Sequence, residues 1–540
     1  MRWVAWGLPS CVHGSVGFLR AVILASLLAG VALPAGAQTT AFTQSLATAA
    51  ADEPAIAEWY RTTDYEPVWT DAADAPRRLA FLAAISGAAD HALPVERYDA
   101  NALTAAFAAA ETEADRGRLE MMMTRAYLAW AHDLTSGVLK PSTVDAGIVR
   151  DIPVIDPQVL LARMSAGDPE TVLRSLLPRS AAYAQLMKAK IGMERRIATG
   201  GWGDAVAAED LEPGATGPMV VALRDRLGRM GYMAPSSSQT YDAVLQAAVA
   251  AFQRDHGLTP NGIAGESTIA EMNVPPTERL KSVVVAMERE RWMHIDRSVR
   301  HIWVNQPEFT AKIIEQGRTV FQTRVVIGKN VPDQRSPEFS DDMEHLVINP
   351  SWGVPRSIIV KEYLPLLQQN PNAAGQLQVV DGRGRVVSRD SVNFAAYNAR
   401  NFPFALRQPP SDGNALGKVK FMFPNPYNIY LHDTPSKSLF SKEVRAFSHG
   451  CIRVADPFDL AHALLSVQSD NAEAEFDRVL QTGDETTVKL LKPVPVHLVY
   501  FTAYPSEKGT ITYARDIYGR DAALFQALTE AGVVLGGVQG

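Results

Sequence analysis

The sequence predicts a multidomain protein in which an α-helical scaffold and a small three-helix module precede a mostly β domain. Three observations support this prediction. Apolar residues recur at helical spacing through the first half of the chain, short runs rich in valine, isoleucine and aromatic residues follow, and glycine- and proline-rich segments separate the parts. A length of 540 residues accommodates roughly three or four domains of ordinary size.

The N-terminus has the features of an export signal. The apolar run AVILASLLAGVALPAGA ends in the small-x-small triplet Ala35-Gly36-Ala37. We therefore expect residues 1–37 to be a cleaved signal peptide, which leaves no membrane span in the mature chain. The alternative is an uncleaved anchor, but Gly30 and Pro34 interrupt a run that is already short for crossing a bilayer.

The chain has two cysteines, and one of them, Cys11, lies within the expected signal peptide. The mature protein then keeps Cys451 alone and cannot form an intramolecular disulfide. A single thiol in an oxidising compartment favours a reactive role, because a purely structural cysteine is readily replaced there. The alternative is a small buried apolar residue.

Two helical units are expected before the β domain. Residues 38–205 contain long alanine-rich segments with helical periodicity and predict a helical scaffold domain. Residues 206–274 predict three short helices, of which the first ends at Gly231, the second before Gly257 and the third begins near Ser267. We expect His256, a lone histidine beside a helix end, on the surface of this module.

The β domain is expected over residues 299–505, followed by a C-terminal extension, 506–540. At least seven runs, among them HIWVNQ, TVFQTRVVIG, KVKFMF and NIYLHD, read as strands. Residues 353–417 interrupt them with a helical segment and glycine- and proline-rich stretches, which is typical of an inserted lid. Composition is that of an ordinary globular protein, and a net charge of −7 with no basic tract excludes nucleic-acid binding as the expected function.

The stretch SHGCIRV, which contains Cys451, carries the expected chemistry. A thiol needs a base or a positive neighbour to act as a nucleophile, and His449 and His432 are the candidates. If NIYLHD is a strand, Tyr430 and His432 share one face of it and line a cleft. Zinc bound by the two histidines and Cys451 is an alternative, which we do not expect because no nearby cysteine or paired histidine completes the ligand set.

These motifs resemble those of a known enzyme family. The segment YLHDTPSKSLFSKEVRAFSHGCIRV is similar to the active-site signature of L,D-transpeptidases of the YkuD fold. The segments INPSWGVP and DIYGRD resemble its larger Gram-negative branch, typified by YcbB, and WYRTTDYEPVW resembles the start of that branch's scaffold. The segment AFQRDHGLTPNGIAGESTIAEMN resembles a peptidoglycan-binding module.

The resemblance implies a role for each residue of the motif. It makes Cys451 the nucleophile and His432 the general base, and it assigns the backbone amides near His449, Gly450 and Cys451 to an oxyanion hole. His449 itself is expected to order the loop. Arg453 is expected to hold a stem-peptide carboxylate, with a structural ion pair as the alternative.

Tyr430 is expected to line the substrate pocket. The implied function is a periplasmic L,D-transpeptidase that needs no metal or organic cofactor and links diaminopimelate to diaminopimelate through a thioester. Its expected partners are a tetrapeptide stem as donor, a stem amine as acceptor, and carbapenem inhibitors. The alternatives are an L,D-carboxypeptidase or amidase acting on the same stems, and a catalytically inactive wall-binding scaffold.

Overall fold

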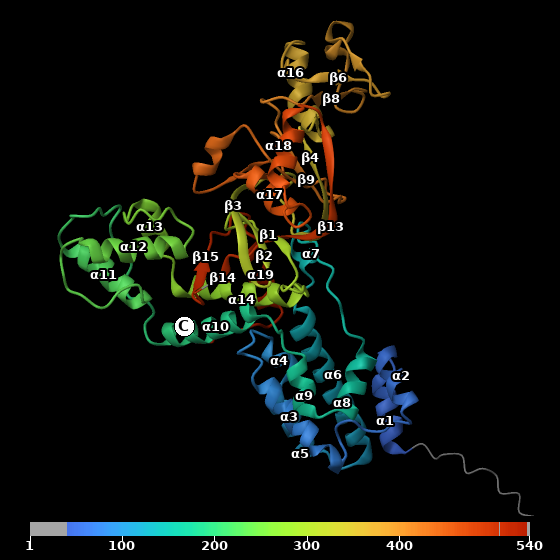
Figure 1. Cartoon of the computed structure of the whole chain (residues 1–540). Coiled ribbons are helices and arrows are strands. Elements are labelled where there is room, and N and C mark those ends of the chain that lie inside the picture. Colours follow the sequence, from blue (N-terminus) through green and yellow to red (C-terminus); the bar gives the residue numbers. More distant parts are fainter. Residues whose placement is uncertain (1–39, 507, 537–540) are drawn as a thin grey trace, which may run out of the picture.

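The computed structural model describes residues 40–506 and 508–536. The expected signal peptide, 1–37, lies outside the described residues. A helical N-terminal part, a small helical module and a β-rich C-terminal domain lie side by side (Figure 1), which confirms the predicted fold class. Within the described ranges, no helix is long and apolar enough to cross a membrane.

The N-terminal part contains a bundle around one long central helix, α6, and two helices that pack outside this bundle, α7 and α10. Its helices are α1 (Ala41–Ala50), α2 (Pro54–Thr62), α3 (Ala75–Ser86), α4 (Val95–Tyr98), α5 (Ala100–Ala109), α6 (Glu113–Ser136), α7 (Pro141–Val144), α8 (Pro157–Ala166), α9 (Pro169–Ser175) and α10 (Ala181–Ala198). Thr112 and Asp115 form a capping box that begins α6. Buried Glu120 of α6 accepts hydrogen bonds from the Tyr60 hydroxyl and the backbone N–H groups of Val68 and Trp69. These bonds fix the entry segment of the scaffold onto its central helix.

The module consists of the three predicted helices. These are α11 (Pro218–Met230), α12 (Ala243–Asp255) and α13 (Glu266–Met272). Gly231 ends α11 in the left-handed conformation that glycine adopts most easily. The predicted stripes face the module's core, in which Val220, Leu223, Leu227, Leu245, Val249 and Phe252 are buried.

The prediction that His256 lies on the surface is wrong. Its ring is 5% exposed and stacks between Phe252, at a centroid distance of 3.9 Å, and Tyr513, at 5.5 Å. Its Nδ1 donates to the Phe252 carbonyl at 2.8 Å. Tyr513 belongs to a hairpin near the C-terminus, so the contact that covers His256 comes from a segment remote in sequence.

A closed sheet forms the C-terminal domain after α14 (Pro276–Trp292). Its strands are β1 (His301–Asn305), β2 (Thr310–Glu315), β3 (Arg318–Gly328), β4 (Phe339–Ile348), β9 (Val419–Met422), β10 (Leu431–His432), β11 (Ala446–Ser448), β12 (Ile452–Val454) and β13 (Thr486–Val499). Their order is β11-β3-β12-β10-β9-β4-β13-β1-β2, and β2 also pairs with β3, which closes the sheet on itself. Alternate residues therefore point into an apolar core and outward.

Helix α17 (Pro457–Leu465) and α18 (Ala472–Gln481) pack onto this core. The remaining C-terminal elements are β14 (Ala503–Pro505), β15 (Ile511–Tyr513) and α19 (Arg520–Glu530), which packs on α14. This part of the extension is thus tied to both the β domain and the helical regions.

The insertion between β4 and β9 has its own apolar core. It contains β5 (Trp352–Gly353), α15 (Arg356–Ile358), a π-helical turn (Ile359–Tyr363), α16 (Leu364–Gln369), β6 (Gln378–Val380), β7 (Val386–Val387) and β8 (Ala405–Gln408). In Figure 1 it projects from the β domain on the side away from the helical bundle. We call this subdomain, residues 352–408, the lid.

Replacing His256 by alanine should detach the module from the hairpin. We expect a loss of about 2 kcal/mol in the stability of this junction at pH 7, because a stacked buried ring is removed. Burial lowers the pKa of His256 to about 3, so its neutral form contributes stability above about pH 6.5 that is lost as pH falls toward 3. Calorimetry should therefore show the gap between wild type and His256→Ala narrowing as pH falls from 6.5 to 4.

Val244→Ala is the control, because Val244 lies on the same helix with its side chain exposed. A gap between wild type and His256→Ala that is independent of pH would contradict the assignment of a buried neutral imidazole.

Candidate active site

The candidate site lies on the outward face of three neighbouring strands. His432 on β10 is in register with Arg453 on the parallel strand β12 and with Lys420 on the antiparallel strand β9. Tyr430 and Cys451 lie two residues before His432 and Arg453. Because side chains alternate along a strand, they point the same way as that pair. The residues between them, such as Leu431 and Ile452, are buried in the core. Residues distant in sequence thus converge on one face.

A cleft of about 880 Å³ covers this face. The strand residues form one wall together with the loop 448–451, which we call the catalytic loop. The lid forms the other wall, with Trp352, Arg356, Glu362 and Tyr363 among its residues. Cys451 is partly exposed in it. The site is therefore a junction between the sheet and the insertion.

The expected strand NIYLHD is shorter than predicted, because only Leu431 and His432 belong to β10. Asn428 adopts a φ of 54°, and the Asn425 side chain bonds the backbone of Ile429, so a turn replaces the first half of the strand. Tyr430 and His432 still face the same side, with their ring centroids 5.6 Å apart. The predicted shared face is thus present.

A backbone carbonyl orients His432. Its Nδ1 donates to the Asp433 carbonyl oxygen at 2.5 Å, which leaves the Nε2 lone pair free to accept a proton. The Asp433 carboxylate instead accepts hydrogen bonds from Lys437 and from the Lys418 backbone. Burial and the charge of Arg453 lower the pKa of His432 to about 3, so its imidazole is neutral at pH 7.

The thiol of Cys451 lies 3.5 Å from the Asn428 carbonyl oxygen. Burial raises its pKa, while hydrogen bonding from Tyr430 and the charges of Lys420 and Arg453 act in the opposite direction. The resting pair is therefore a neutral thiol beside a neutral imidazole. Such a pair needs proton transfer during the attack on a substrate.

The hydroxyl group of Ser448 holds the loop that leads to Cys451. The Ser448 Oγ accepts from the Gly450 N–H at 3.1 Å and donates to the Cys451 carbonyl at 2.5 Å. The Gly450 amide is thus bonded within the loop, and its expected contribution to an oxyanion hole stays a prediction. The Cys451 N–H makes no hydrogen bond within the described part of the chain.

His449 points to the lid. Its Nε2 lies 2.5 Å from Glu362 Oε1, and its side chain is 29% exposed. This contact bridges the catalytic loop and the lid across the cleft. An acid on the lid that bonds this loop could not be identified from the sequence.

Arg453 and Lys420 are the cations closest to the thiol. Arg453 has no carboxylate within ion-pair distance among the described residues, and its buried Nε has no hydrogen-bond partner there. Lys420 lies over the Tyr430 ring with its Nζ 4.1 Å from the centroid, and burial lowers its pKa. We did not predict Lys420, although the alternation in KVKFMF places it on the polar face of that strand.

In the described ranges, no group of three His, Cys, Asp or Glu side chains is placed to hold a metal ion.

Three family models match the chain. Residues 54–189 match a "Scaffold domain", 216–272 a "Putative peptidoglycan binding domain" and 299–490 an "L,D-transpeptidase catalytic domain". A curated Haemophilus influenzae protein named "Putative L,D-transpeptidase" is 31% identical over 269 residues, which cover 48% of this chain and 54% of that protein. The chain thus spans about half the length of this relative.

Two solved L,D-transpeptidase structures are similar at 15% identity. One, from Xylanimonas cellulosilytica, covers 55% of this chain and 100% of its own, with a TM-score of 0.18. The other, from Stackebrandtia nassauensis, covers 54% and 96%, with a TM-score of 0.20. Scores this low carry no argument about the fold. The family matches carry it instead: residues 299–490 are an L,D-transpeptidase catalytic domain of the YkuD family, and the same chain holds the scaffold and peptidoglycan-binding domains that precede it.

Proposed function

We propose that the protein is a periplasmic L,D-transpeptidase that links two diaminopimelate residues of peptidoglycan through a cysteine thioester. The observation that supports this most directly is the convergence of Cys451, His432 and two unpaired cations on one face of the sheet, inside a cleft. The adjoining peptidoglycan-binding domain would hold the polymer near this cleft.

The proposed first step is acylation. The Cys451 Sγ attacks the carbonyl carbon of the third stem residue while its proton moves to the neutral Nε2 of His432. The carbon–nitrogen bond to the terminal D-alanine breaks, and the imidazolium returns the proton to that leaving amine. The Cys451 N–H faces the developing oxyanion.

The proposed second step releases the product. The side-chain amine of a second stem attacks the thioester, gives up a proton through His432, and expels the thiolate, which is reprotonated. The cross-link forms and the enzyme is restored without a metal or organic cofactor. Arg453 and Lys420 would hold carboxylates of the stems, because both are positive and have no carboxylate partner among the described residues.

Incubating the mature protein with a purified disaccharide tetrapeptide tests the acceptor. Mass spectrometry should detect cross-linked dimers together with free D-alanine. Tripeptide without dimers would replace the proposal by an L,D-carboxypeptidase. In a parallel incubation with cell walls that carry covalently bound protein, release of that protein would indicate an amidase. A chain that fails to form a covalent adduct with a carbapenem would be a wall-binding scaffold without catalysis.

His432→Ala should reduce the acylation rate of Cys451 by about a hundredfold or more, because the proton acceptor is removed. His449→Ala should leave most acylation intact and lower thermal stability, because it breaks the bond to Glu362 on the lid. Rates of carbapenem acylation and melting temperatures of both variants, with Cys451→Ser as the blank, measure this. A stable but inactive His449→Ala beside an active His432→Ala would reverse the assignment of the base.

Lys420→Met should weaken the reaction with anionic stems. We expect KM for a tetrapeptide to rise roughly tenfold, the order of one charge-assisted hydrogen bond. The effect on an amidated, neutral stem should be much smaller. Lys418→Met is the control, because Lys418 lies two residues away, pairs with Asp412 and does not line the cleft. Equal effects on charged and neutral stems would contradict a carboxylate-binding role.

A further inference from the structure

A short segment beneath the catalytic loop holds that loop from the core side. We call it the strap, residues 334–338. Its Ser336 is completely buried, and the Ser336 Oγ donates to the Gly450 carbonyl oxygen at 2.6 Å. The Ser336 Oγ also accepts a hydrogen bond from the Gly328 N–H at 3.0 Å. Ser336 therefore links the end of β3 to the residue that precedes Cys451.

This bond fixes the direction of the next amide. The Gly450 carbonyl and the Cys451 N–H belong to one peptide group, which is planar and trans, so they point in opposite directions. With the carbonyl held toward Ser336 in the core, the Cys451 N–H points away from the core. Gly450 has a φ of 116°, a backbone conformation that glycine adopts readily because it has no Cβ.

Hydrogen bonds with the C-terminal extension hold the strap in place. The Tyr518 hydroxyl accepts from the Ser336 N–H at 3.2 Å and donates to the Gly328 carbonyl at 2.7 Å. Arg520 donates to the Ser336 carbonyl at 3.1 Å. Glycine is required at Gly328, since a Cβ there would lie 2.0 Å from the carbonyl oxygen of Gln334. The strap therefore has no freedom to shift toward or away from the sheet.

The scaffold domain contacts the other end of the strap. The Glu338 N–H donates to the Gly147 carbonyl at 2.7 Å, and the Val149 N–H donates to the Glu338 carbonyl at 2.8 Å. Ile148 thus pairs with Glu338 as in a parallel sheet. Asp145 of the scaffold also bonds Arg520 at 3.1 Å, next to the Arg520–Glu338 ion pair.

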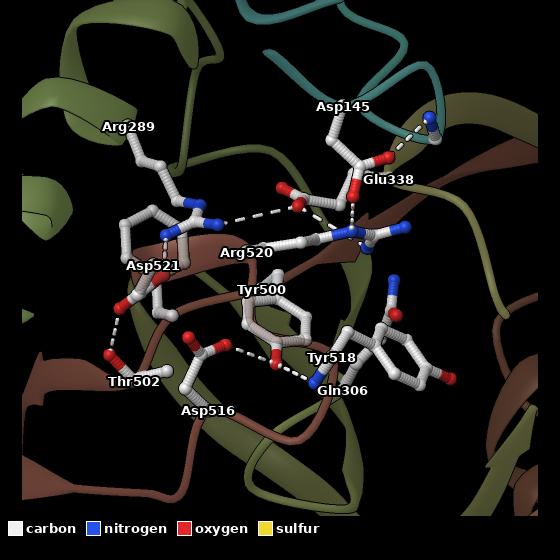
Figure 2. Close-up of polar contacts among 12 residues, drawn as sticks. Asp145, Arg289, Gln306, Glu338, Tyr500, Thr502, Asp516, Tyr518, Arg520 and Asp521 are labelled. Atoms are coloured by element: carbon white, nitrogen blue, oxygen red, sulfur yellow. Dashed lines mark hydrogen bonds and ion pairs between the residues drawn. The ribbon is translucent and has the colours of Figure 1, made fainter. Parts of the chain in front are cut away.

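Figure 2 shows these charges side by side. Arg289 of α14 and Arg520 of α19 both reach Glu338, Arg289 also pairs with Asp521, and Asp145 approaches Arg520 from the scaffold. The two arginines and Glu338 are at most 2% exposed, so each depends on the others for compensation. Three separate parts of the chain therefore set the position of the strap.

We propose that Ser336 is a positioning residue for acyl transfer: it aims the Cys451 N–H at the oxyanion, and scaffold residues 145–149 keep Ser336 in place. This rests on the proposed thioester chemistry. The scaffold domain then has a role in catalysis beyond joining the domains, because it supports the peptide plane next to the nucleophile.

Two reagents that react with Cys451 distinguish a loss of oxyanion stabilisation from a general loss of structure around the thiol. A carbapenem acylates Cys451: a sulfur–carbon bond forms, the β-lactam carbon–nitrogen bond breaks, and the nitrogen receives a proton, by way of an oxyanion. Iodoacetamide alkylates the same sulfur with loss of iodide and needs no oxyanion stabilisation. In the full mature chain, Ser336→Ala should lower the acylation rate at least about tenfold and change alkylation less than about threefold.

Ser336→Thr, which retains the hydroxyl group, should restore the ratio of the two rates. Asp145→Asn should lower the ratio in the same direction by a smaller factor, and Asp151→Asn, at an exposed neighbouring position, should not change it. Ser136→Ala is the matched control for a lost buried hydroxyl, because its Oγ bonds the Pro153 carbonyl far from the loop.

The proposal is overturned if the ratio of the acylation rate to the alkylation rate is the same in Ser336→Ala as in the wild type, whether both rates fall equally or neither changes. If Ser336→Ala does not fold, the ratio in Asp145→Asn decides: a fall supports the proposal and no change refutes it. Wild-type protein that is alkylated but never acylated would instead refute the proposed function, so the two failures are distinct.

Discussion

The parallel pairing of β10 with β12 is the contact on which the site depends. It places His432 beside Arg453 and, two positions earlier on each strand, Tyr430 near Cys451. Parallel neighbours need a crossover, and the chain between these strands makes it through a short 3-10 helix and β11. The catalytic loop is the end of that crossover. Its position is therefore set by sheet register more than by the sequence SHGC itself.

The register also decides the electrostatics of the site. Three strands bring two cations and an imidazole to one face, and the lid lines the opposite side of the cleft. Burial keeps the imidazole of His432 neutral and raises the pKa of the Cys451 thiol, while Lys420 and Arg453 oppose the second effect. A neutral pair resists oxidation better than a thiolate, because the thiolate is the reactive form. The cost is that each attack on a substrate must begin with proton transfer.

The spacing of apolar and polar residues within single segments predicted the fold class and the shared face of Tyr430 and His432. Helix and strand periodicity can be recognised in this way because it depends only on residues close together in the sequence. Contacts between remote segments were not predictable in this way. His256 is covered by Tyr513, which follows it by more than two hundred residues, so a correct helix prediction still gave a wrong exposure. Nothing in the stretch PDQRSPEF marks Ser336, whose partner Gly450 follows it by more than a hundred residues. Lys420 differs, since strand alternation alone would have placed it on the cleft face.

Two structures act on the catalytic loop from opposite sides. From the lid, Glu362 bonds His449, and from the core, Ser336 bonds Gly450. The first contact is partly exposed, so it contributes less to stability than a buried contact of the same kind. The second is completely buried, and breaking it would leave polar groups without partners. The loop is thus fixed on the side that sets the backbone geometry for the reaction and adjustable on the side where a substrate enters. The peptide group between Gly450 and Cys451 is therefore held by the buried contact with Ser336 and not by the contact with the lid.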